Sequence, residues 1–169
     1  MTDHIKALRI EPIAKHHSRD EFRCDKPELD VYLQRFARQN DEKNIAKTFV
    51  AVDDGSHVLG YYSLSTASVA FADLPDSIRQ SLPAYPVPAA RIARLAVDKS
   101  MKGQGLGAKL LIDAVQRIVG ASREIAVKVI LVDAKDEEAR DFYKHFGFIE
   151  LPEQDLKLFL PIETVKQLF

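Results

Sequence analysis

The sequence predicts a single α/β (α+β) domain in which helices flank a sheet. The chain has 169 residues, of which 46% are hydrophobic. This length is enough for one well-buried core and too short for two ordinary domains. Strand-like segments rich in β-branched and aromatic residues alternate with segments whose apolar residues recur every three or four positions, and no linker-like stretch separates them. We therefore expect residues 1–169 to fold as one domain.

The N-terminal half predicts a helix followed by a β-hairpin. The segment FRCDKPELDVYLQRFARQN (22–40) has helical apolar spacing, and Asp25 with Glu28 has the spacing of a capping box ahead of it. The runs TFVAV (48–52) and VLGYYSLSTASVA (58–70) are strand-like and are separated by the turn sequence DDGS. We expect these two runs to pair as a hairpin.

The second half predicts strands that alternate with helices. Residues 73–90 carry four prolines, which leaves room for a short helix over 77–81 and otherwise predicts irregular chain. The other expected elements are strands at RIARLAV (91–97), IAVKVILVDA (125–134) and LKLFLPI (156–162), and helices at GLGAKLLIDAVQRIVG (105–120), closed by Gly120, and DEEARDFYKHF (136–146), capped by Gly147.

The charge and hydropathy of the chain exclude several classes of protein. A formal net charge of −1 and a pI near 6.5 argue against a uniformly basic nucleic-acid-binding surface. The first ten residues, MTDHIKALRI, lack the pattern of a secretory signal, and no run approaches the roughly 20 apolar residues that a membrane span needs. We expect a cytoplasmic protein that has no membrane partner.

The single cysteine and the histidines predict no separate reactive centre. Cys24 cannot form an internal disulfide, which suits a reducing compartment. We expect it to be a small core residue rather than a nucleophile assisted by His16 or His17, because nothing in the sequence positions these residues together. The histidines show no paired metal-ligand spacing, so we expect no metal site. They are His4, His16, His17, His57 and His145.

The stretch RLAVDKSMKGQGLGAKLLIDAV (94–115) combines a strand, a glycine-rich turn and the start of a helix. Unpaired backbone N–H groups at a helix start attract anions, and a bare glycine turn lets a phosphate come close to them. A dinucleotide-binding turn would need a different glycine spacing, early in a βαβ unit. The glycine pattern itself leaves a phosphate site and a purely structural turn open.

Two motifs, taken in their order along the chain, favour the phosphate site over the structural turn. The sequence KGQGLG, four residues after the strand segment RLAV and followed further along by ARDFYKHFGF, resembles the GNAT family of N-acetyltransferases. Lys102 stands where that family has Arg or Gln. The resemblance implies a GNAT fold with a mixed, mostly antiparallel sheet, and acetyl-CoA as co-substrate. The cofactor-binding residues that it implies are Leu95, Ala96, Val97, Lys102, Gly103, Gln104, Gly105, Leu106, Gly107, Asp136 and Phe142.

The same resemblance places Tyr143 beside the thioester sulfur. An amine that attacks a thioester must expel a thiolate, and since a thiol has a pKa near 8.5 this leaving group benefits from a proton donor. A phenol can supply that proton without carrying a charge. We therefore expect Tyr143 to be the catalytic general acid. Most carboxylates of DAKDEEARD (133–141) are expected to be solvated or to favour the helix start.

Longer segments, including YPVPAARIARLAVDKSMKGQGLGAKLL and VDAKDEEARDFYKHFGF, look like the acetyltransferase toxins of bacterial toxin–antitoxin pairs. That resemblance implies acetylation of the α-amino group of aminoacyl-tRNA, a ribbon-helix-helix antitoxin as partner, and a homodimer. Asp25 departs from it, since these toxins favour glycine there. Residues 71–110 carry six Lys and Arg against three acids, so a local tRNA-binding patch is expected there and on the first helix. Its expected members are Arg38, Arg79 and Arg91.

Two other functions stay open at this stage. One is acetylation of a small amine, a protein N-terminus or a lysine. The other is an acyl-CoA-binding regulatory module without turnover, which the presence of Tyr143 disfavours.

Overall fold

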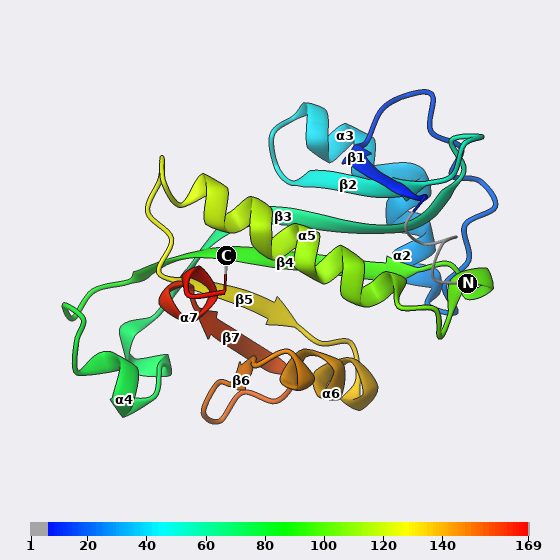
Figure 1. Cartoon of the computed structure of the whole chain (residues 1–169). Coiled ribbons are helices and arrows are strands. Elements are labelled where there is room, and N and C mark those ends of the chain that lie inside the picture. Colours follow the sequence, from blue (N-terminus) through cyan, green and yellow to red (C-terminus); the bar gives the residue numbers. More distant parts are fainter. Residues whose placement is uncertain (1–6, 169) are drawn as a thin grey trace. The chain divides into compact units, whose positions relative to one another are not determined.

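The computed structural model describes residues 7–168, so His4 lies outside the described part (Figure 1). The described chain groups into two compact units. Unit 1 comprises residues 7–65 with Ala93–Ala114, and unit 2 comprises Thr66–Ile92 with residues 115–168. Two strands and the longest helix run from one unit into the other. No helix among the described residues is long and apolar enough to cross a membrane.

Seven strands form a mixed sheet in the order β1-β2-β3-β4-β5-β7-β6. Strands β4 and β5 pair in parallel, whereas the pairs β1·β2, β2·β3, β5·β7 and β6·β7 are antiparallel. The expected mixed, mostly antiparallel sheet flanked by helices is confirmed. The strands are β1 (Arg9–Pro12), β2 (Lys47–Val52), β3 (Val58–Val69), β4 (Val87–Val97), β5 (Val129–Asp133), β6 (Ile149–Glu150) and β7 (Lys157–Pro161).

Two strands differ from the sequence-based expectation. Strand β4 begins four residues earlier than expected, because Ala89 and Ala90 already pair with β5 and the carbonyl of Pro88 accepts a hydrogen bond from Lys128 N (2.9 Å). The proline is tolerated there since it contributes an acceptor and lacks only the donor. Strand β5 begins at Val129, four residues later than expected. Strands β1 and β6 were not predicted.

The helices largely follow the predicted segments. The first predicted helix contains a π-helical segment, Tyr32–Phe36, between α2 and α3. Helix α5 continues past Gly120, so the prediction that this glycine closes the helix is wrong. Gly147 has a φ of +96° after α6, which confirms its left-handed cap. The helices are α2 (Pro27–Val31), α3 (Ala37–Glu42), α4 (Asp76–Arg79), α5 (Leu106–Ala121), α6 (Glu137–His145) and α7 (Ile162–Lys166), the last of which was not predicted.

The expected capping box at the first helix is wrong. Lys26 is the N-cap residue, and no side chain caps this helix. Pro27 occupies the first helical turn, which keeps the residue before it extended. Asp25 has a left-handed φ of +68°. Its carboxylate pairs with Lys102 instead of capping the helix.

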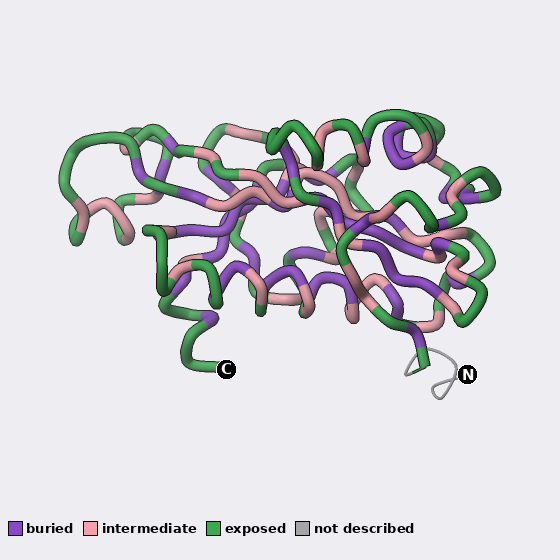
Figure 2. The backbone as a smooth tube through the Cα atoms, turned by 90° about the horizontal axis from the view of Figure 1, so that it is seen from above, coloured by how far each residue is buried: buried purple, intermediate pink, exposed green. Residues whose placement is uncertain are grey.

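The core of unit 1 lies between the β2–β3 hairpin and the helices that begin at Pro27. The hydroxyl of Tyr61 on β3 donates to the carbonyl of Leu29 on α2 (2.7 Å), which ties the sheet to the helix. Thr48 and Ser63 face each other across the hairpin and share a buried hydrogen bond of 3.0 Å. Figure 2 colours the backbone by burial and shows that many of the outward turns of the chain are exposed.

The core of unit 2 is built around β5 and β7. Val129 and Leu131 on β5 pack with Phe159 on β7 and with Val69 and Leu74 from the segment around the end of β3. Strand β5 is central in this unit because it pairs with β4 on one side and β7 on the other. Its last residue, Asp133, pairs with Lys157 of β7 at the end of this core.

Candidate active site

Hydrogen bonds of Asp98 fix the chain where β4 ends and the glycine-rich turn begins. The amide of Asp98 donates to Leu59 O (2.8 Å). Its carboxylate accepts from the amide of Arg23 (2.8 Å) at Oδ1 and from the amide of Ser100 (3.0 Å) at Oδ2. These bonds lower the pKa of Asp98 against the opposing effect of its partial burial. The turn therefore leaves the strand in one defined direction.

The turn itself has room for an anion. Gly103 and Gly105 have φ values of +75° and +85°, and a Cβ added at either residue would meet no atom within 4 Å. The glycines are therefore needed for backbone conformation and not for internal packing. Leu106 begins α5 and buries its side chain, which anchors the helix start. Backbone N–H groups at a helix start attract phosphates, and the open side of this turn leaves room for one.

Lys102 of this turn is paired with Asp25. Its Nζ lies 2.9 Å from Asp25 Oδ2, across 77 positions of sequence. This hydrogen bond and the lysine charge lower the pKa of the Asp25 carboxyl. Both side chains are more than half exposed. An incoming phosphate would therefore compete with Asp25 for the lysine.

Replacing Asp25 by glycine is expected to strengthen acetyl-CoA binding severalfold. The change removes one carboxylate partner of Lys102, and glycine adopts the left-handed conformation of residue 25 without strain. Asp25→Asn is the matched control, since it removes the charge and keeps a residue tolerated at positive φ. Calorimetry with CoA measures both variants. Unchanged affinity in both would mean that Lys102 does not contact the cofactor phosphates.

Tyr143 lies on α6 and is nearly buried, with 5% of its surface exposed. Its ring packs edge-on against Phe142 and Phe148, at centroid distances of 5.4 and 5.6 Å. Burial and, to a lesser extent, the negative charge of Asp133 raise the pKa of Tyr143 above its ordinary value near 10. Within residues 7–168 no hydrogen bond of its hydroxyl is found. The phenol therefore stays protonated at neutral pH and can donate its proton to a ligand.

Asp136 and Phe142 were also expected to contact the cofactor, and both have contacts within the protein. Asp136 is the N-cap of α6, and its Oδ1 accepts a hydrogen bond from the amide of Ala139 (2.9 Å). Phe142 is half-buried and packs against Tyr143 and Phe146. Both residues thus support the position of Tyr143.

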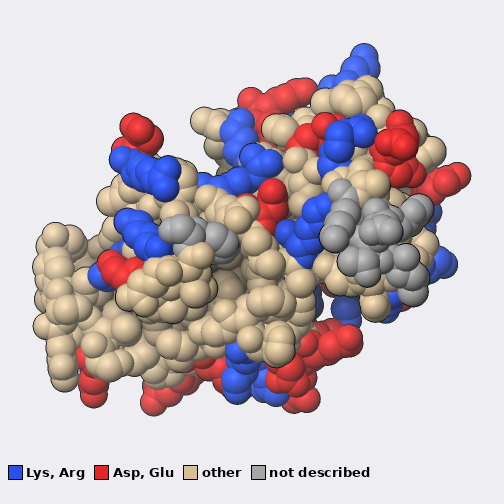
Figure 3. Space-filling model, viewed as in Figure 1, with Lys and Arg blue, Asp and Glu red and all other residues tan. Residues whose placement is uncertain are grey.

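The three arginines expected to meet tRNA all have acidic partners. Arg38 lies 3.3 Å from Glu42 on α3, and Arg79 is paired with Asp76 on α4. Arg91 Nη1 lies 3.0 Å from Asp133 Oδ2. On the face drawn in Figure 3, side chains of both signs are mixed. Each of these three cations is therefore partly neutralised by its own acidic partner.

Cys24 has the environment of a core residue. It is buried, and burial followed by its hydrogen bonding to Asp30 raises its pKa to about 12. No thiolate forms near neutral pH, so the alternative in which Cys24 acts as a nucleophile is not supported.

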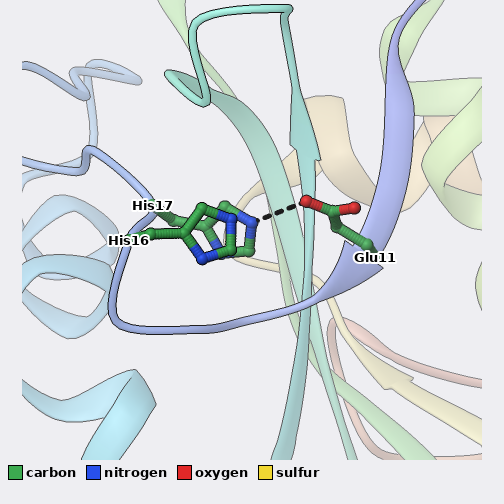
Figure 4. Close-up of side chains that lie close together, drawn as sticks. All are labelled: Glu11, His16 and His17. Atoms are coloured by element: carbon green, nitrogen blue, oxygen red, sulfur yellow. Dashed lines mark hydrogen bonds and ion pairs between the residues drawn. The ribbon is translucent and has the colours of Figure 1, made fainter.

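Among residues 7–168, the structure does bring together one set of side chains of the kind that hold metals. Glu11, His16 and His17 have ligand atoms within 4.8 Å of one another (Figure 4). The ring of His17, however, accepts a hydrogen bond from Ala14 N at Nδ1 (2.9 Å) and therefore carries its proton on Nε2, which lies 2.7 Å from Glu11 Oε1. Both ring nitrogens are used in this loop. Hydrogen bonding explains the cluster without a metal.

Two ion pairs that are candidates for a functional role could not be recognised in the sequence. They are the ion pair of Lys102 with Asp25 and the ion pair of Arg91 with Asp133. Asp133 was counted among the solvated carboxylates of its segment. The parallel pairing of β4 and β5, which places Arg91 opposite Leu131, was the missing information.

A strand that ends in an open glycine turn at a helix start, and a buried protonated tyrosine on a later helix, are the features expected of an acetyltransferase that uses acetyl-CoA. The family model described as an acetyltransferase (GNAT) domain matches residues 44–150. The chain belongs to the GNAT acetyltransferase family.

Curated relatives cover most of the chain. A tRNA-acetylating toxin of Mycobacterium tuberculosis is 42% identical over 147 residues, which are 87% of this chain and 87% of the relative. A protein described as the probable toxin TacT of Sinorhizobium fredii is 33% identical over 169 residues, which cover 94% of this chain and 93% of the relative.

Solved structures of toxins share the fold. A tyrosine-to-phenylalanine mutant of KacT matches with a TM-score of 0.93 at 30% identity, covering 96% of this chain and 99% of that one. AtaT in complex with acetyl-methionyl-tRNA matches with a TM-score of 0.90 at 30% identity and the same coverage. AtaTR bound with acetyl-CoA matches with a TM-score of 0.86 at 29% identity, covering 97% and 99%.

Proposed function

We propose that this enzyme acetylates the α-amino group of aminoacyl-tRNA, and that it thereby acts as a toxin. The observation that carries this proposal is the protonated phenol of Tyr143, held in a domain that is 42% identical to a tRNA-acetylating toxin. An acetylated α-amine cannot form a peptide bond, so the reaction would stop translation. The alternative of an acyl-CoA-binding module without turnover would leave this phenol without a role.

In the proposed site, acetyl-CoA supplies the acetyl group as a thioester. Backbone groups of Leu95–Val97 would hold its pantetheine arm, and the turn from Lys102 to Gly107 would hold its pyrophosphate. Asp136 and Phe142 complete the proposed cofactor-binding residues. We propose that residues 1–169 work as one acetyltransferase domain.

Tyr143 is proposed to act as the general acid. The neutral amine forms a bond to the acetyl carbon as the bond to sulfur breaks, and the departing sulfur takes the phenolic proton of Tyr143. The proton that the amine loses returns to the tyrosine through solvent, so the products are the amide and free CoA. An α-amine has a pKa near 8, against about 10.4 for lysine, and therefore has a much larger neutral fraction than a lysine at the same pH, so it needs no strong base.

We also propose protein partners for this enzyme. One solved relative is AtaT bound to the C-terminus of the antitoxin AtaR, with a TM-score of 0.83 at 26% identity, covering 96% of this chain and 98% of that one. We propose a cognate antitoxin of the ribbon-helix-helix type and a homodimeric toxin. Charged tRNA is a cytoplasmic substrate, so we place the enzyme in the cytoplasm. Arg38, Arg79 and Arg91 are the proposed tRNA contacts.

Radiolabelled acetyl-CoA tests the substrate directly. We expect label on total charged tRNA and none on the same tRNA stripped of its amino acids. Labelling should fall steeply as salt rises, because phosphate contacts release counterions when they form. Label on neither tRNA pool, together with rapid acetylation of a polyamine or a protein N-terminus, would replace this function by the small-amine or protein alternative.

A further inference from the structure

A small polar cavity in unit 2 opens beside the carboxylate that acts on Tyr143. The cavity has a volume of about 140 Å³, and its polar lining residues include Asp73, Arg91, Asp133, Gln154 and Lys157. Pockets for drug-sized ligands measure about 300–1,000 Å³, so this one suits a small head group and not a nucleotide. Its lining comes from the end of β3 and the segment after it, from β4 and β5, and from the segment before β7 together with the first residue of β7.

One ion pair dominates this cavity. Arg91 Nη1 donates to Asp133 Oδ2 at 3.0 Å, and the two side chains are 36% and 39% exposed. No other hydrogen bond of the Asp133 carboxylate to a residue within 7–168 is found, so Oδ1 remains available to a ligand. The pair is also open to solvent, and an ion pair of this kind contributes little to stability. A cationic ligand can therefore displace the arginine at small cost.

Asp133 is the last residue of β5, and Tyr143 lies on α6, the next element along the chain. The charge of Asp133 is the second cause, after burial, of the raised pKa of Tyr143. A cation held at Asp133 would consequently stand near the proton donor of the reaction. Aminoacyl-tRNA carries such a cation, since its α-amine is largely an ammonium group at neutral pH.

We propose that this cavity receives the amine of the acyl acceptor, and that the Asp133 carboxylate binds its ammonium form after Arg91 moves away. The bound ammonium gives one proton to solvent, and the neutral amine then attacks the thioester. This inference rests on the proposed function and names the residue that positions the acceptor. Arg91, once released, is free to meet a phosphate of the tRNA end. Asp133 is thus a substrate-binding residue, and Tyr143 remains the proton donor.

Asp133→Asn tests the proposal because it keeps the shape of the side chain and removes its charge. Loss of one charge-assisted hydrogen bond should raise the KM for charged tRNA about 10- to 100-fold, with a smaller change in kcat and no change in CoA affinity. Uncharged tRNA lacks the amine, so its inhibition constant against charged tRNA should stay at the wild-type value. Asp133→Glu should restore part of the lost affinity.

Glu150→Gln is the matched control. Glu150 belongs to the same unit, is 39% exposed like Asp133, and forms a comparable ion pair with Lys144 (3.1 Å) outside the cavity. Its variant should keep the wild-type KM for charged tRNA. An unchanged KM in Asp133→Asn, or an equal rise in the inhibition constant of uncharged tRNA, would overturn the inference. Absence of tRNA acetylation by the wild-type enzyme would instead contradict the proposed function.

Discussion

Tyr143→Phe is expected to lower the turnover of acetyl transfer by about 10²–10⁴-fold, the usual contribution of a general acid or base. The change removes only the hydroxyl, so the ring keeps its contacts with Phe142 and Phe148 and the fold is retained. Release of CoA with charged tRNA as acceptor measures turnover, and calorimetry with CoA measures binding.

Comparing turnover with CoA binding distinguishes a loss of the chemical step from a loss of the folded state. Binding of CoA at wild-type affinity together with lost turnover supports the role of Tyr143 as acid. Induced expression of this variant should also permit growth where the wild-type chain arrests it. Wild-type turnover in the variant would remove Tyr143 from the mechanism.

Gly105→Val is expected to have the second largest effect, a loss of acetyl-CoA affinity of about 100-fold or more. Residue 105 has a φ of +85°, where a β-branched side chain is strained. The new side chain would fill the open side of the turn, where a Cβ now meets no atom within 4 Å. It would therefore stand where the pyrophosphate has to approach.

Gly120→Val, in the helix that follows the turn, is the control for this variant. A Cβ at Gly120 also meets no atom within 4 Å, and its φ lies outside the left-handed region. Calorimetry should give wild-type CoA affinity for this variant and weak binding for Gly105→Val. If Gly105→Val binds CoA as well as the wild type does, the turn has only a structural role.

Local patterns in the sequence were sufficient for the hairpin, for α5 and for α6. Their apolar spacing and turn residues act over a few positions, which a single sequence displays directly. Strands β1 and β6 have four and two residues, so they show too little alternation to be recognised. They exist because neighbouring strands provide pairing partners.

Long-range pairs could not be predicted from the sequence. Asp25 was assigned to a helix cap because Glu28 follows at the right spacing, whereas its actual partner is Lys102. Asp133 looked like one more solvated acid because Arg91 lies 42 positions away. In both cases a local sequence pattern suggested one role for the aspartate. The tertiary fold instead pairs it with a cation far away in the sequence.

The buried state of Cys24 has a practical consequence for measuring the enzyme. It is the one cysteine of the chain, and with a pKa of about 12 it offers almost no thiolate at neutral pH. A thiol-reactive dye added to a reaction mixture should therefore respond to the CoA that is released and hardly to the protein. Continuous colorimetric assays can accordingly be run at high enzyme concentration, and the catalyst itself should tolerate mild oxidants that inactivate enzymes with exposed thiols.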